Sequence, residues 1–216
     1  MSRWPAAGGG RWVDVDPGRV TRWVAGFAER HGPPETTPRD YGLLLSAPDG
    51  ATAELHSPPG APGAGDLGGF VAAAKAPRRL GLLLARKGAV AVGVAVGEKL
   101  TASKVDTRYV QGRTAAGGWS QQRFARRRDN QAKAATADAV ELAVRLLLPE
   151  VAVLAALVCG GDRRAVDAVL ADRRLAPLAG LRAERLLDVP EPRRAVLDAA
   201  VAAARAVHVL IRDPET

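Results

Sequence analysis

The sequence predicts a mixed α/β (α+β) fold, in which a twisted mixed sheet with an antiparallel meander is flanked by helices. Two observations predict it. Residues 80–110 hold three consecutive strand-like segments joined by short turns, and residues 120–211 then alternate between helical and strand-like patterns. This order is typical of a layered domain in which helices cover a sheet. With 216 residues, 47% of them hydrophobic, the chain is long enough to bury the core of such a domain.

The N-terminal part is expected to contain a tail, a helix and a hairpin. Residues 1–15 begin with a Gly- and Ala-rich segment and are predicted to form a flexible tail. Asp16 is an N-cap candidate followed by proline, and apolar residues then recur at helical spacing until Gly32. A Pro-Asp-Gly turn at residues 48–50 separates two strand-like segments. A Pro- and Gly-rich connection completes this predicted region, residues 16–69.

The meander is the best-defined part of the predicted second domain, residues 70–216. Residues 80–85 are continuously apolar, and residues 90–96 alternate valine with alanine or glycine. A third strand is expected from about Leu100 to Val110. The remaining elements are predicted to be a long helix, a buried strand, a helix, a strand, a helix and a last strand: 120–148, 151–158, 162–174, 182–189, 190–206 and 207–211.

Cysteine and histidine offer no site of their own. Cys159 is the single cysteine, so no internal disulfide is expected, and it is predicted to be a buried small apolar residue. The histidines at 31, 56 and 208 are scattered and are predicted to be structural. We therefore predict no metal site and no cofactor. No apolar run is long enough to cross a bilayer, so a cytoplasmic protein without a membrane partner is expected.

Positive charge is concentrated in one segment. The formal net charge is +8, and residues 99–133 hold nine basic residues but only two acidic ones, whereas the rest of the chain is nearly balanced. A field confined to one segment indicates a polyanion bound there, while an evenly spread charge would indicate only solubility.

The same segment carries an unusual loop between a strand and the long helix. Gly112, Gly117 and Gly118 allow its backbone to approach another molecule closely, and Trp119 is able to stack on a nucleobase. The first turns of the helix are rich in arginine at three- and four-residue spacing. A purely structural interpretation remains open, with a Gly-Gly turn, Ser120 as an N-cap and a solvated arginine face. Against it, cations near a helix N-terminus cost about 0.3 to 1 kcal/mol each, which a bound polyanion would offset.

The run Gly117-Gly118-Trp119-Ser120-Gln121 resembles the Gly-x-x-Gln loop of the ribosome quality-control peptidyl-tRNA hydrolases. These are relatives of the catalytic domain of eukaryotic class-I peptide release factors, and residues 117–131 look especially like their actinobacterial-type members. The resemblance covers about Leu80 to Ile211. It implies a ribonuclease-H-like, release-factor catalytic-domain-like fold acting on peptidyl-tRNA held by a stalled large ribosomal subunit. Because termination factors have Gly-Gly-Gln without an insertion, the inserted Trp119-Ser120 favours rescue over codon-directed termination.

The resemblance also implies roles for particular residues. Gln121 would be the catalytic glutamine, supported by the paired glycines Gly118 and Gly117, while Gln122 is one position too far from Gly118. Ribosomal RNA and tRNA, but not DNA, are the expected partners. The residues expected to bind RNA are Arg108, Arg113, Trp119, Arg123, Arg126, Arg127, Arg128 and Lys133.

Two other functions are compatible with parts of this pattern. A non-catalytic RNA- or ribosome-binding module would use the same basic helix, with Gln121 an ordinary polar residue. A metal-dependent nuclease on a ribonuclease-H-like sheet would need carboxylates at strand ends. Residues 80–85 and 90–96 contain no acidic residue, which disfavours the nuclease.

Overall fold

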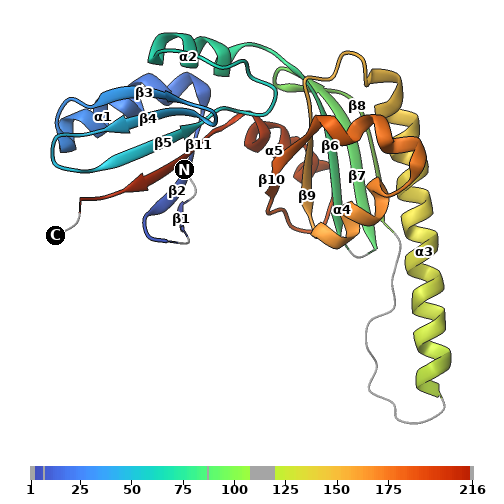
Figure 1. The fold of residues 1–216 in the computed structure, drawn as a ribbon. Helices are drawn as coiled ribbons and strands as arrows, with labels where there is room; N and C mark the ends of the chain where they lie inside the picture. Colours follow the sequence, from blue (N-terminus) through green and yellow to red (C-terminus); the bar gives the residue numbers. More distant parts are fainter. Residues whose placement is uncertain (1–2, 7, 87, 108–119, 215–216) are drawn as a thin grey trace. The chain divides into compact units, whose positions relative to one another are not determined.

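The computed structural model describes residues 3–6, 8–86, 88–107 and 120–214, with the backbone alone at residues 3 and 120–132. The chain forms two compact units. The N-terminal unit comprises Met1–Arg78 and Ala202–Thr216, and the central unit comprises Arg79–Val201. Each is described separately below, and Figure 1 labels their elements.

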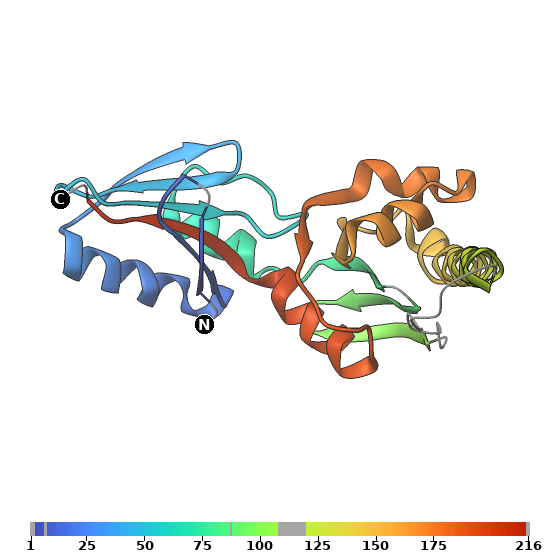
Figure 2. The same ribbon diagram turned by 90° about the horizontal axis from the view of Figure 1, so that it is seen from below.

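The N-terminal unit is a six-stranded antiparallel sheet with helices on one face. Its helices are α1 (Val20–His31) and α2 (Leu67–Lys75), which bury Phe27 and Phe70 against one face of the sheet. Figure 2 shows α1 along that face. The strands, in spatial order, are β1 (Arg3–Pro5), β2 (Arg11–Val15), β11 (Val207–Arg212), β5 (Thr52–His56), β4 (Gly42–Ser46) and β3 (Glu35–Arg39).

Local predictions in this unit are confirmed where the signal lies in neighbouring residues. The Asp16 side chain accepts a 2.8 Å hydrogen bond from the Gly18 backbone, capping the 3-10 turn η1 (Pro17–Arg19) that leads into α1. The predicted hairpin is β4 and β5, with its turn at residues 47–51. The predicted connection has no regular structure from residue 57 to 66, but it ends earlier than the expected residue 69, because α2 begins at Leu67.

The prediction of a flexible N-terminal tail is wrong. Within residues 1–15 the chain instead forms β1 and β2, and β2 pairs along its whole length with β11. Val13 and Val15 are 0% and 3% exposed, because their side chains enter the core under the helices. The local sequence could not show this, since the strand that completes the pairing lies about two hundred residues later.

The central unit is a five-stranded mixed sheet with the order β10-β9-β6-β7-β8. The predicted meander is confirmed, because the first three of its strands along the chain pair antiparallel in succession, while the two later strands add to the sheet in parallel. In chain order the strands are β6 (Arg79–Arg86), β7 (Ala89–Val96), β8 (Lys99–Thr107), β9 (Ala156–Gly161) and β10 (Arg182–Leu187).

Helices cover both faces of this sheet. The long helix α3 (Ser120–Leu147) and the short helix α4 (Arg163–Leu170) lie on one face, and α5 (Arg194–Arg205) lies on the other (Figure 2). The 3-10 segments η2 (Leu148–Glu150) and η3 (Arg173–Leu181) follow α3 and α4. None of the helices in the described residues is long and apolar enough to span a membrane.

Three predicted elements of the second domain differ from the structure. The strand expected from residue 151 begins at Ala156, because η2 and a further turn follow Leu147. The helix expected over 162–174 ends at Leu170, and η3, which contains Pro177, follows it. The last strand, β11, joins the N-terminal sheet and not the mixed sheet of the meander. The division between units falls at Arg78 and Arg79, later than the expected residue 69.

Candidate functional site

The strand β8 and the helix α3 flank the predicted catalytic loop. β8 is described as far as Thr107, within the strand expected from about Leu100 to Val110, and α3 begins at Ser120, as the sequence predicts. Gln121 is the second residue of α3, so its backbone belongs to the first helical turn. Gly117, Gly118, Trp119, Arg108 and Arg113 lie outside the described residues, and the backbone alone is described for Arg123, Arg126, Arg127 and Arg128. Lys133, the remaining predicted RNA-binding residue, is exposed on α3.

The C-terminal half of α3 anchors the helix to the central unit. Ala139, Val140, Ala143 and Leu147 are at most 4% exposed and pack against the meander and α4. Apolar spacing in the sequence predicts an inner stripe of Ala132, Ala135, Ala139, Leu142 and Leu146. Of these, Ala139 and Leu142 are buried, and Val140 and Ala143 are buried with them. Gln121 precedes Ala139 by 18 residues, about 27 Å along the axis at the usual rise of an α-helix. Figure 1 accordingly shows the N-terminal half of α3 extending past the end of the sheet.

Two charged residues of β8 share the sheet face that α3 covers. Lys104 pairs with Val92 and Asp106 with Val90, and both valines belong to the core cluster beneath α3. Lys104 is exposed. It lies in the predicted basic segment but was not among the predicted RNA-binding residues, because its side of the strand follows only from the β7–β8 register. The structure therefore adds a described cation on the face that carries α3.

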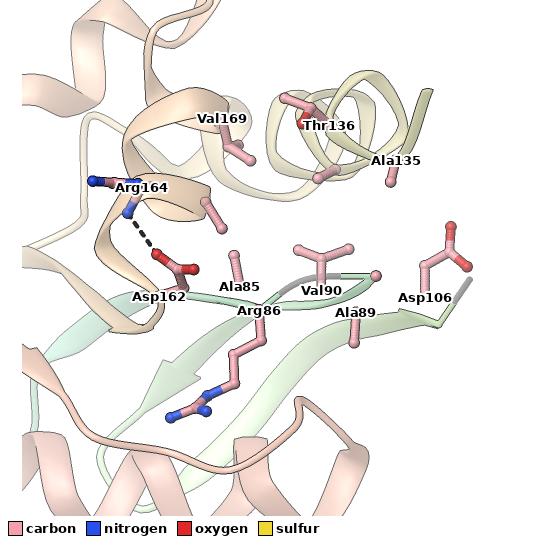
Figure 3. Close-up of a pocket in the computed structure, with 13 residues that line it drawn as sticks. Ala85, Arg86, Ala89, Val90, Asp106, Ala135, Thr136, Asp162, Arg164 and Val169 are labelled. Carbon is pink, nitrogen blue, oxygen red and sulfur yellow. Dashed lines mark hydrogen bonds between the residues drawn. The ribbon is translucent and has the colours of Figure 1, made fainter. Parts of the chain in front are cut away.

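A pocket of about 280 Å³ lies between α3, α4 and the turn from β6 to β7 (Figure 3). Its walls are apolar and include Ala85, Val90 and Val169, while Asp106 and Asp162 lie at its border. Among the residues of α3 whose side chains are described, the lining residue nearest its N-terminus is Ala135, 14 residues and about 21 Å along the helix from Gln121. The pocket is thus distinct from the predicted catalytic position.

The turn after β9 has a structural role. Asp162 accepts a 2.8 Å hydrogen bond from the Arg164 backbone and caps α4. Cys159, in the strand before it, is 1% exposed, and burial raises the pKa of its thiol to about 11. A thiol that is buried and protonated at neutral pH is a poor nucleophile, so its prediction as a small apolar core residue is confirmed.

A protein-family model matches the part of the sequence that forms the central unit. Residues 78–210, more than half of the chain, match the model of the family described as "Actinobacteria/chloroflexi VLRF1 release factor". The chain belongs to this VLRF1 release factor family. The match covers the whole central unit and includes the predicted loop and the basic first half of α3.

Two solved structures are similar to this VLRF1 family member at low sequence identity. The archaeal translation termination factor aRF1 is 17% identical with a TM-score of 0.40, over 59% of this chain and 36% of that chain. A structure described as "Archaeal protein" is 15% identical with a TM-score of 0.40, over 74% of this chain and 52% of that chain. The chain thus spans about a third to a half of the proteins it matches. No curated protein shows significant similarity.

Two histidines of the N-terminal unit are paired with aspartates. His31 Nδ1 lies 2.9 Å from Asp49 Oδ2, and His208 Nδ1 lies 2.8 Å from Asp14 Oδ1. Across the described residues, no group of three or more His, Cys, Asp or Glu side chains is placed to hold a metal ion.

Proposed function

We propose that the chain is a peptidyl-tRNA hydrolase that releases nascent peptide from tRNA on stalled large ribosomal subunits, in ribosome rescue in the cytoplasm. The observation that carries the proposal is the position of Gln121 in a member of the VLRF1 release factor family. It follows Gly117-Gly118-Trp119-Ser120 and opens the helix α3.

The chemistry requires little from the protein. The ester between peptide and tRNA is already activated, so the catalyst has to admit one water molecule, orient it, and place a donor near the leaving oxygen or the developing oxyanion. The Gln121 amide is able to donate such a hydrogen bond without an acid–base pair or a cofactor. Gly117 and Gly118 carry no side chain that would hinder a close approach to the tRNA end.

The length and anchoring of α3 support this role. Because its C-terminal half is fixed in the core, the helix holds Gln121 about 27 Å beyond the anchored residues, at a rise of 1.5 Å per residue. The active group would thereby reach into a recessed site in ribosomal RNA while the body of the domain stays outside. The proposed RNA contacts are Arg108, Arg113, Trp119, Arg123, Arg126, Arg127, Arg128 and Lys133.

A release assay separates this function from a non-catalytic binding module. Purified large subunits carrying labelled peptidyl-tRNA are mixed with the full-length protein, and both free peptide and bound protein are measured over time. We expect the peptide to be released as an intact chain with the tRNA ester cleaved. Stable binding without release would reject the hydrolase and leave the RNA-binding module as the function.

A further inference from the structure

The pocket between α3, α4 and the turn from β6 to β7 has a carboxylate at each of two ends. Asp106 stands at the end formed by β8, and Asp162 stands at the end where α4 begins (Figure 3). The cavity measures about 280 Å³. Neither aspartate belongs to the predicted loop or to α3, so the proposed release of peptide does not use this pocket.

The floor between the two carboxylates is apolar and is formed by β6 and β7. The Asp162 backbone donates a 2.8 Å hydrogen bond to the carbonyl of Ala85, which pairs with Val90 in the next strand. Val90 in turn pairs with Asp106. The side chains of Ala85 and Val90 are 3% and 6% exposed and belong to the core on the face that α3 and α4 cover. The two aspartates are thus three strand spacings apart, about 14 Å between their backbones at ~4.8 Å per spacing.

The two arginines that border the pocket direct their side chains away from it. Arg86 follows Ala85 in β6, so its side chain lies on the other face of the sheet, where its guanidinium is 3.2 Å from the Asp188 carboxylate. Figure 3 shows Arg86 on the opposite side of the strand from Ala85, and it shows the Arg164 side chain pointing away from the cavity. Among the lining residues that the structure describes, the carboxylates therefore face the cavity without a cation.

Each aspartate keeps an oxygen for a ligand. Asp162 Oδ1 accepts the 2.8 Å hydrogen bond from the Arg164 backbone that caps α4, and the second oxygen lies on the side of Ala85 (Figure 3). Asp106 is half-buried and, in the described part of the chain, forms no ion pair. Lys104, on the same face, is exposed and does not line the pocket. A partly buried carboxylate without a cation is costly, and a bound ammonium group would offset that cost.

We propose that the pocket binds an aliphatic diamine, with one ammonium on each carboxylate and the methylene chain on Ala85 and Val90. The ligand has to carry two positive charges, because apolar surface separates the carboxylates and a single ammonium reaches only one of them. An extended alkyl chain advances about 1.25 Å per bond at a bond length of about 1.5 Å, and each N–H···O contact adds about 2.8 Å. A diamine of four to six carbons thus spans about 12 to 14 Å, which matches the separation of the aspartates.

A bound diamine would contact two helices at once. Ala135 and Ala139 of α3 and Val169 of α4 line the same cavity, so the ligand would hold the anchored half of α3 against α4. Binding itself needs no contribution from Gln121. The proposal therefore stands or falls independently of the hydrolase.

Isothermal titration calorimetry of the full-length protein with hexane-1,6-diamine tests the proposal. We expect saturable binding to one site that weakens as salt is added. Hexylamine has the same carbon chain but a single ammonium, so it should bind at least about tenfold more weakly through the loss of one charge-assisted hydrogen bond. Ethane-1,2-diamine carries both charges but is too short for the span, and it should bind as weakly as hexylamine.

Two single substitutions identify the carboxylates. Asp162→Asn removes the charge but keeps a good helix cap, so α4 should remain folded. Asp162→Asn and Asp106→Asn are each expected to weaken binding of hexane-1,6-diamine about tenfold. Asp198→Asn is the matched control, because Asp198 is exposed on α5, on the other face of the sheet (Figure 2), and affinity should stay within about twofold.

Hydrogen exchange of the unmodified protein locates the site without any substitution. Hexane-1,6-diamine should slow exchange in α4 and in residues 135–139 of α3, and it should leave the N-terminal unit unchanged. Equal affinity for hexylamine and the diamine, unchanged affinity in both aspartate variants, or no saturable binding would overturn the proposal. Slower exchange confined to another part of the protein would do the same.

Discussion

At the scale of single residues, Gly161 shows most directly how the backbone fixes a position. It ends β9 with φ of +97°, in the left-handed region that side chains rarely adopt. A Cβ there would also collide with the backbone carbonyl of Ala85 in the neighbouring strand. The glycine at this turn is therefore required by the geometry between β9 and α4.

We expect Gly161→Ala to lower the free energy of unfolding by about 1 to 3 kcal/mol, the range for strained or overpacked substitutions. Gly180→Ala is the control, because no atom lies within 4 Å of the position that a Cβ would take there and its φ is not positive. Urea denaturation followed by circular dichroism measures both. Equal stability of the two variants would show that the turn relaxes without strain.

The role of a residue could be predicted where it depends on residues close to it in the sequence. Asp16 was recognised as a cap because proline follows it, and Cys159 was recognised as buried because its strand is apolar. The stacking of Trp12 on His208 could not be predicted, because the pair is 196 positions apart and depends on the pairing of β2 with β11. The catalytic role of Gln121 remains a prediction.

At the scale of elements, α3 combines an anchored half with a basic half. The anchored half was predicted from apolar spacing: Ala139 and Leu142 of the predicted stripe are buried, and the unpredicted Val140 and Ala143 are buried with them. The meander was predicted because valine alternation and short turns are local signals. The start of β9 was not, because the valines at 151 and 153 look strand-like but occupy a turn after η2.

For the basic half of α3, we expect Arg126→Glu/Arg127→Glu to weaken binding to large ribosomal subunits and to flatten its salt dependence. Each lost phosphate contact should reduce the slope of log affinity against log salt by about 0.7 to 0.9. Arg145→Glu, an exposed change in the anchored half of the same helix, is the control. Binding is measured by filtration across a salt series. If the double variant kept the slope of the unmodified protein, Arg126 and Arg127 would not contact phosphates.

At the scale of the whole molecule, a strand late in the sequence pairs with strands near its beginning. The last strand, β11, lies between β2 and β5 in the sheet of the N-terminal unit, so the two ends of the sequence build one core. A strand at residues 207–211 was predicted from the sequence, but we expected it to belong to the second domain. Hydrophobic pattern identifies a strand, but its partners are fixed by tertiary packing that a local pattern does not contain.

We therefore expect a chain ending at Ala206 to lose the fold of the N-terminal unit, because β2 and β5 each lose a paired neighbour and Val207, Val209 and Ile211 leave the core. Hydrogen exchange should show lost protection in β2 and β5, with protection retained in β6 and β7 of the central unit. A chain ending at Pro214 serves as the control. Retained protection in β2 after the deletion would show that β11 is dispensable.

Gln121 is proposed to perform the chemistry of peptide release, and the rest of the proposed function depends on it. The decisive test is the rate of release of labelled peptide by Gln121→Ala and by its neighbour Gln122→Ala, at matched occupancy of large subunits carrying peptidyl-tRNA. We predict that Gln121→Ala binds as the unmodified protein does but releases at least about a hundredfold more slowly, whereas Gln122→Ala retains release. Release by Gln121→Ala at the rate of the unmodified protein would show that this glutamine is not the catalytic group.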